Sequence, residues 1–131
     1  MKDSEQFRKG DKVRRAVLGD EFVNKSFANA DDFSREMFIL STEYCWGEIW
    51  TREGLDRKTR SIVNLAMRAA LNRPHELKLH TKGALRNGLS KDEIKEILLQ
   101  VAIYCGVPAG VDSFRNVKEA IREYEEESKK A

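Results

Sequence analysis

The chain has 131 residues, 40% hydrophobic and 35% charged, which is typical of one soluble globular domain and excludes a disordered chain. The net charge of +2, without a basic run among aromatic residues, predicts no nucleic-acid partner. No apolar run approaches the ~20 residues that span a bilayer and no signal peptide opens the chain, so we expect a cytoplasmic protein without membrane contact.

The first half of the chain predicts three helical stretches. Residues 4–18 form a helix that Gly19 ends, and residues 20–30 form a short helix or an irregular link. Asp31 or Asp32 then caps a helix that runs to about residue 50. The side chains that we expect this helix to bury in the core are Phe33, Met37, Leu40 and Tyr44.

Glu43 lies in an apolar line on the same helix. The spacing places it between Ile39 on one side and Trp46 and Trp50 on the other. Because burial disfavours the charged form of a carboxyl, this position predicts a raised pKa for Glu43. The alternative is a Glu43 that is exposed or paired with an arginine in a structural ion pair.

The second half predicts four helices, at about residues 56–72, 74–87, 90–105 and 108–124. The segment Ile62–Leu71 is apolar almost all round, so we expect it at the centre of the core. The helix at 74–87 has a row of cations, Lys78, Lys82 and Arg86, that we expect to face water. The charged tail from Glu123 is expected to fray.

Local signals fix the ends of the helix at 74–87 and the start of the next. Pro74 suits the first helical position, where a missing N–H costs nothing, and Gly88 suits a left-handed stop. Ser90, with Glu93 three residues later, forms a capping box. The sequence therefore predicts an all-α helical bundle of about six helices, a single domain over residues 1–131.

The helix at 90–105 is apolar on more than one face. Ile94, Leu98 and Val101 share one face, and Leu99 and Ile103 lie on another. An apolar strip this wide is unusual on a monomer, so we expect a homo-oligomer. Cys45 and Cys105 lie among apolar neighbours in predicted helices and are expected to be reduced packing residues.

His80 is the most informative polar residue. Glu76 lies one turn earlier on the same helical face, where it can orient the imidazole or balance its charge. His75 and His80 are five residues apart and so on different faces, and no CxxC or HxxxH spacing occurs, so we expect no metal site. Taken in isolation, a helix histidine is more often packed or exposed than catalytic.

A family resemblance gives His80 a role. The segments VRRAVLGDEFV, EYCWGEIWTREGLDRKTRSIVNLAMRAALNRPHEL, ELKLHTKGALRNGLSKDEIKEILLQVAIYCGVPA and VDSFRNVKEA resemble γ-carboxymuconolactone decarboxylases over nearly the whole chain. The resemblance implies an all-helical fold shared with alkylhydroperoxidase D-type proteins, a hexameric ring and a decarboxylation without a cofactor. The peroxidase motif CxxCxxxH is absent, because its two cysteine positions hold Arg73 and Glu76.

The resemblance also implies the substrate and the roles of residues. The expected reaction is decarboxylation of the small lactone dicarboxylate 4-carboxymuconolactone to 3-oxoadipate enol-lactone, in the catabolism of aromatic compounds. His80 matches the family's histidine and is the expected acid–base residue, with Glu43 as the second candidate. The other expected site residues, which would bind the substrate, are Arg14, Arg15, Trp46 and Glu76.

Alternatives remain open at this point. Arg14 and Arg15 are adjacent, hence about 100° apart on a helix, and the plain interpretation of the pair is solvated charge. A related enzyme that decarboxylates another lactone or a keto acid is one alternative function. A non-catalytic binding or assembly protein with the same fold is another.

Overall fold

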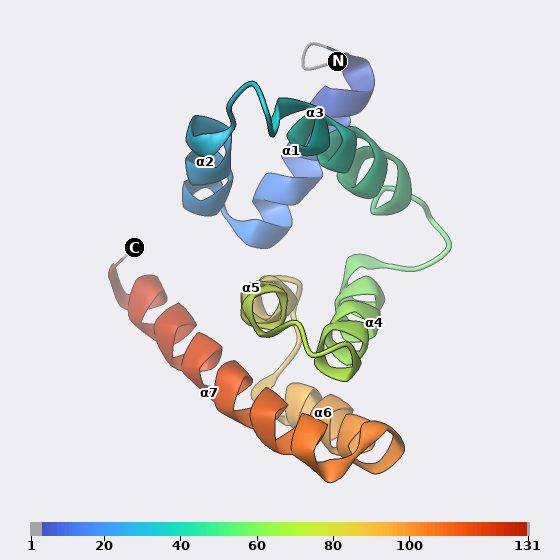
Figure 1. Ribbon diagram of the computed structural model, residues 1–131, viewed down its shortest axis with the longest axis vertical. Coiled ribbons are helices and arrows are strands. Elements are labelled where there is room, and N and C mark those ends of the chain that lie inside the picture. Colours follow the sequence, from blue (N-terminus) through green and yellow to red (C-terminus); the bar gives the residue numbers. More distant parts are fainter. Residues whose placement is uncertain (1–3, 131) are drawn as a thin grey trace. The chain divides into compact units, whose positions relative to one another are not determined.

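A computed structural model describes residues 4–130, which contain helices and no strands (Figure 1). The predicted all-α class is confirmed. The chain divides into two compact units, unit 1 up to Asp56 and unit 2 from Arg57. Unit 1 contains α1 (Glu5–Leu18), α2 (Asp20–Asn29), α3 (Arg35–Leu40) and the π-helix η1 (Ser41–Ile49). Unit 2 contains α4 (Arg57–Ala70), α5 (Pro74–Arg86), α6 (Lys91–Cys105) and α7 (Val107–Lys130).

In unit 1, α1 and η1 approach so closely that their backbones touch. Each helix has a glycine at the contact, Gly10 in α1 and Gly47 in η1. A Cβ atom on Gly10 would lie 1.9 Å from the carbonyl oxygen of Thr42, and one on Gly47 would lie 2.6 Å from that of Gln6. A side chain at either position therefore requires the backbones to move apart.

The segment predicted as one α-helix up to residue 50 is α-helical only as far as Leu40. From Ser41 to Ile49 it is a π-helix, in which each N–H donates to the carbonyl five residues earlier. The same pattern closes its last turn, where the Trp50 N–H donates to the Cys45 carbonyl at 3.0 Å. An α-helical period therefore does not describe this stretch.

The predicted core stripe of this segment is wrong. Phe33 is 96% exposed, and Met37, Leu40 and Tyr44 are exposed as well. The side chains that the segment buries are Thr42, Trp46 and Trp50. The cause is the close packing against α1, which selects the side of η1 that carries Thr42 and Gly47.

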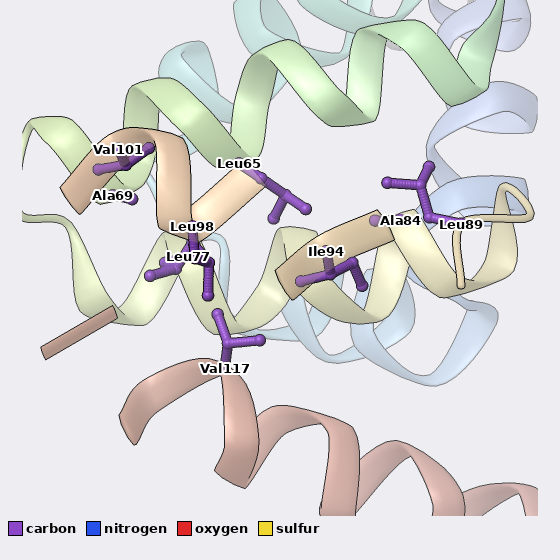
Figure 2. Packing of buried hydrophobic residues seen from close by; sticks show 9 residues of the cluster. All are labelled: Leu65, Ala69, Leu77, Ala84, Leu89, Ile94, Leu98, Val101 and Val117. Carbon is purple, nitrogen blue, oxygen red and sulfur yellow. The ribbon is translucent and has the colours of Figure 1, made fainter. Parts of the chain in front are cut away.

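Unit 2 packs α4, α5, α6 and α7 around one core (Figure 2). Its buried apolar residues are Leu65, Ala69, Leu77, Ala84, Leu89, Ile94, Leu98, Val101 and Val117. The segment Ile62–Leu71 reaches this core through Leu65 and Ala69. The expectation of burial all round is wrong, because Met67 on the other side of α4 and Leu71 just after its end are exposed.

The prediction that the cations of α5 face water is wrong. Lys78 pairs with Glu119 of α7 at 2.8 Å, and Lys82 pairs with Glu127 of α7 at 2.9 Å. Glu123 lies between them and bridges both lysines, at 3.3 and 3.1 Å. These contacts form a ladder of ion pairs, because residues four apart on each helix meet residues four apart on the other.

The same ladder explains why the predicted fraying of the tail is wrong. α7 stays helical to Lys130, and Glu123 and Glu127 are two of the acids that α5 holds. Arg86 of α5 extends the contact, since its guanidinium lies 5.5 Å from the ring centroid of Tyr124. The acidic run thus belongs to the packing of unit 2.

Both cysteines are exposed, so the prediction of two packing residues is wrong. Cys105 lines a shallow apolar groove between α4 and α6.

α6 buries Ile94, Leu98 and Val101, and Ile103 is 79% exposed. Residues 4–130 thus leave the second apolar face of α6 uncovered. In the part of the chain that the structure describes, no helix is long and apolar enough to cross a membrane.

Candidate active site

α5 begins and ends where the sequence predicted. Pro74 is its first residue, and Gly88 follows its C-cap with a φ of 98°. The next helix opens with the predicted capping box, in which the Ser90 hydroxyl accepts from the Glu93 N–H at 3.1 Å and the Glu93 carboxylate accepts from the Ser90 N–H at 2.9 Å. These local signals place His80 in the middle of α5.

His80 is buried, with 5% of the residue exposed. Its Nε2 lies 3.8 Å from Oε2 of Glu76, one turn earlier on the same helix, and the Glu76 side chain is 42% exposed. Glu76 therefore has one oxygen near the buried imidazole and still reaches solvent. The predicted proximity of the two side chains is confirmed.

Arg68 of α4 also acts on His80. Burial is the first cause that lowers the pKa of His80, to about 4, and the positive charge of Arg68 is the second. The charge of Glu76 opposes them but is weaker. His80 is therefore neutral at pH 7 in this structure.

We expect this depressed pKa to make the protein less stable in acid. An unfolded histidine binds a proton near pH 6.5, whereas folded His80 binds one only near pH 4. Between these values the unfolded state holds more protons, so the free energy of unfolding falls by up to about 3 kcal/mol as the pH falls from 7 to 4. Urea unfolding at several pH values would measure this loss.

The matched controls are His80→Gln and His75→Gln. His75 is the other histidine and is exposed, so His75→Gln should keep the wild-type dependence on pH. His80→Gln should flatten it between pH 6.5 and 4, where carboxyl groups contribute equally to wild type and variant. If the free energy of unfolding depends on pH equally steeply in both variants, that result would contradict a His80 that is buried in its neutral form.

Glu43 of η1 is half-buried and is a carboxylate. Its pKa is lowered, because a hydrogen bond from the Ser4 hydroxyl favours the charged form. The predicted raised pKa is therefore wrong: hydrogen bonding to the carboxylate outweighs its burial. The rings of Trp46 and Trp50 are stacked on each other with centroids 4.8 Å apart.

Arg14 and Arg15 of α1 both have partners within unit 1. Arg15 donates to Asp11 at 2.9 Å, to Asn24 at 2.8 Å and to Asp20 at 3.3 Å, so its guanidinium joins α1 to α2. Arg14 lies 4.9 Å from the ring centroid of Phe38. Neither resembles a solvated surface charge, which was the plain interpretation of the pair.

The predicted site residues thus fall into two groups, one within each unit. Glu43, Trp46 and the two arginines belong to unit 1, and Glu76 and His80 belong to unit 2. Sequence reasoning missed Arg68, although a signal was present: it is the one charged residue in the apolar segment Ile62–Leu71. Within residues 4–130, no group of three or more side chains is arranged to hold a metal ion.

Two known proteins are similar to this chain over most of its length. A 4-carboxymuconolactone decarboxylase of Acinetobacter baylyi is 37% identical over 94% of this chain and 92% of its own length. A nitrosuccinic acid decarboxylase of Metarhizium robertsii is 44% identical over 82% of this chain and 75% of its own. The sequence profile of the carboxymuconolactone decarboxylase family matches residues 35–119. The chain belongs to that family.

Membership confirms the resemblance read from the sequence. This carboxymuconolactone decarboxylase family member is a carboxy-lyase, as both named relatives are decarboxylases. The matched range begins at the first residue of α3 and includes His80, Glu76 and Glu43. Arg14 and Arg15, in α1, lie outside that range.

Proposed function

We propose that this decarboxylase converts 4-carboxymuconolactone to 3-oxoadipate enol-lactone in the catabolism of protocatechuate through the β-ketoadipate pathway. The observation that supports this substrate is the likeness to the 4-carboxymuconolactone decarboxylase, which extends over 92% of that protein. A cytoplasmic location is part of the same proposal.

In unit 2, the buried His80 and its neighbour Glu76 can supply groups that the reaction needs. Loss of CO₂ from the lactone leaves a carbanion that is delocalised onto the lactone carbonyl, so the substrate itself is the electron sink. The developing oxyanion needs a hydrogen-bond donor in a site that excludes water, and the carbon needs a proton. The imidazole of His80 can donate to the oxyanion, and Glu76 can fix its orientation.

The other proposed residues lie within unit 1, and the family resemblance alone assigns them. Trp46 has an apolar surface of the kind that a departing carboxylate needs, and Arg14 and Arg15 are cations of the kind that bind a retained one. Arg15 would then exchange one of its present partners, Asp11 or Asp20, for the substrate. Glu43 is the second candidate for acid–base work, and because it is a carboxylate, it would accept a proton first.

A second substrate is favoured by the relative with the higher identity. That protein is named for nitrosuccinic acid, a dicarboxylic acid with a nitro group. Loss of CO₂ beside a nitro group also leaves a delocalised carbanion, with the charge on the nitro oxygens. The same donors in the same site would serve both reactions, and the shape of the pocket would select between them.

The proposal is tested by incubating the purified protein with each acid separately and following the release of CO₂. Rapid release from 4-carboxymuconolactone, with the enol-lactone as the product, supports the first substrate. Release from nitrosuccinate alone would replace it with the second. If neither acid loses CO₂ faster than in buffer, both substrate assignments fail and the family membership stands.

We also propose that the protein is a homo-oligomer, with a hexamer as the first expectation. The exposed apolar residues of α6, Leu99, Ile103 and Tyr104, supply a surface that a second copy would bury. Light scattering should give a mass of about six times 15.1 kDa at micromolar concentration. Ile103→Glu should lower that mass, because a charge would be buried at the contact.

The matched control adds the same charge elsewhere. Ser128 is exposed near the end of α7, and Ser128→Glu should leave the assembly unchanged. A stable wild-type monomer would contradict the proposal, and so would equal masses of wild type and Ile103→Glu.

A further inference from the structure

We propose that Arg68 binds a carboxylate of the substrate beside His80 and is therefore a substrate-binding residue of this site. The inference rests on the proposed function, since it takes a small dicarboxylate as the substrate. It adds Arg68, a cation of α4, to the site residues that the sequence and the family resemblance predicted.

The packing of α4 against α5 places Arg68 level with His80. The two helices run antiparallel, and the Asn87 side-chain amide donates to the Ser61 hydroxyl at 2.9 Å. Arg68 lies seven residues after Ser61, and His80 lies seven residues before Asn87. Seven residues are about two turns of an α-helix, so both side chains return to the faces that meet at the hydrogen bond. The electrostatic effect of Arg68 on His80 agrees with this placement.

The guanidinium of Arg68 has unused capacity to bind an anion. Arg35, Arg115 and Arg122 each form an ion pair with a carboxylate, whereas Arg68 forms none within residues 4–130. Its Nε is buried there and has no hydrogen-bond partner. A buried donor without a partner is costly, and a carboxylate matches the planar fork of arginine in bidentate fashion.

The acids that could compete for Arg68 are already engaged. Asp112 of α7 and Arg68 line the same small cavity, but the Asp112 carboxylate pairs with Arg115 at 2.9 Å. The α7 acids that reach α5, Glu119, Glu123 and Glu127, pair with Lys78 and Lys82. Glu76 is then the acid that acts on His80, from its own helix.

Binding of an anion at Arg68 has a consequence for His80. A carboxylate would neutralise the charge that helps to keep the imidazole deprotonated, and it would add a negative charge next to the ring. The pKa of His80 should therefore rise when a dicarboxylate binds, so that the bound complex takes up protons below neutral pH. The substrate would in this way charge the group that later delivers a proton to carbon.

The probe for this proposal is succinate, a dicarboxylate that cannot lose CO₂ by this route. Calorimetry would measure its affinity for the intact protein at pH 5.5, in two buffers that differ in ionisation enthalpy so that proton uptake is counted. NMR of the labelled imidazoles would follow the titration of His80. The variants are Arg68→Leu, which removes the charge, and Arg68→Lys, which keeps it without the planar fork.

Arg57 provides the matched control. It is exposed on the same helix, eleven residues or about 16 Å from Arg68, and Asn87 contacts only its backbone carbonyl. Arg57→Leu removes the same charge and should bind succinate as wild type does.

We expect Arg68→Leu to weaken succinate binding about ten- to hundredfold and to abolish the proton uptake. The pKa of His80 in the free variant should rise by roughly one unit. Arg68→Lys should fall between wild type and Arg68→Leu.

The proposal would be overturned if Arg68→Leu bound succinate as tightly as the wild type does. It would also be overturned if Arg57→Leu lost as much affinity for succinate as Arg68→Leu. Failure of succinate to bind the wild type at millimolar concentration would overturn it too. These results can be told apart from those of the CO₂ assay. Succinate binding that depends on Arg68 can persist even if the protein does not turn over the lactone. If Arg68→Leu turns over the lactone with an unchanged KM, the substrate-binding role of Arg68 is refuted and the proposed function stands.

Discussion

Replacing His80 with alanine is expected to lower kcat by roughly 10²–10⁴-fold, the usual cost of losing a positioned acid–base group. The imidazole is buried beside Glu76 and is the group of unit 2 that can donate to the oxyanion. Steady-state kinetics with the lactone measures the loss, and circular dichroism and light scattering check that the variant is folded and assembled.

His75→Ala is the matched control, because His75 is an exposed histidine in the first turn of the same helix. It should keep the wild-type kcat. A near-normal kcat in folded His80→Ala would move the acid–base role to Glu43, and Glu43→Gln would then carry the large loss.

Replacing Gly10 with alanine is expected to destabilise unit 1 by about 3 kcal/mol or more, at or above the upper end of the usual cost of overpacking. The added methyl group would lie 1.9 Å from the carbonyl oxygen of Thr42 and 2.9 Å from the amide nitrogen of Gly47. Both obstacles are backbone atoms, so no change of rotamer relieves the clash. The gain in helix propensity from glycine to alanine, about 1 kcal/mol, is too small to compensate.

Tryptophan fluorescence makes this experiment specific for unit 1. The two tryptophans of the chain, Trp46 and Trp50, are both buried in that unit, next to the affected contact. Urea unfolding followed by their emission should show a lower midpoint in Gly10→Ala. Gly54→Ala is the control, since a Cβ there would meet nothing within 4 Å. An unchanged midpoint in Gly10→Ala would mean that the two helices are not in backbone contact.

The features that could be predicted from the sequence depend on neighbouring residues. The capping box of Ser90 and Glu93 and the ends of α5 at Pro74 and Gly88 were all predicted correctly. Each involves groups within one turn of the chain, whose spacing fixes the geometry. The same holds for the contact between Glu76 and His80.

The features that could not be predicted depend on contacts between distant segments. A π-helix at Ser41–Ile49 has no clear local signal, and its buried side follows from the approach of α1. The low pKa of Glu43 depends on a donor that is distant in sequence, the Ser4 hydroxyl. The ion pairs of Lys78 and Lys82 required knowledge that α7 lies along α5.

The site shows the same division. The helical position of His80 and its neighbour Glu76 follow from the sequence, whereas the electrostatic effect of Arg68 comes from another helix. Arg68 interrupts an apolar segment, and that pattern alone marks it as unusual without giving it a partner.

The π-helix also bears on how relatives are to be aligned with this chain. Because its hydrogen bonds span five residues instead of four, η1 uses more residues for a given number of turns than an α-helix does. A relative with an α-helix here would need fewer residues between positions 41 and 49. A short gap in an alignment at this place would then record a change of helix type, with the residues that follow still in register, rather than the loss of a structural element.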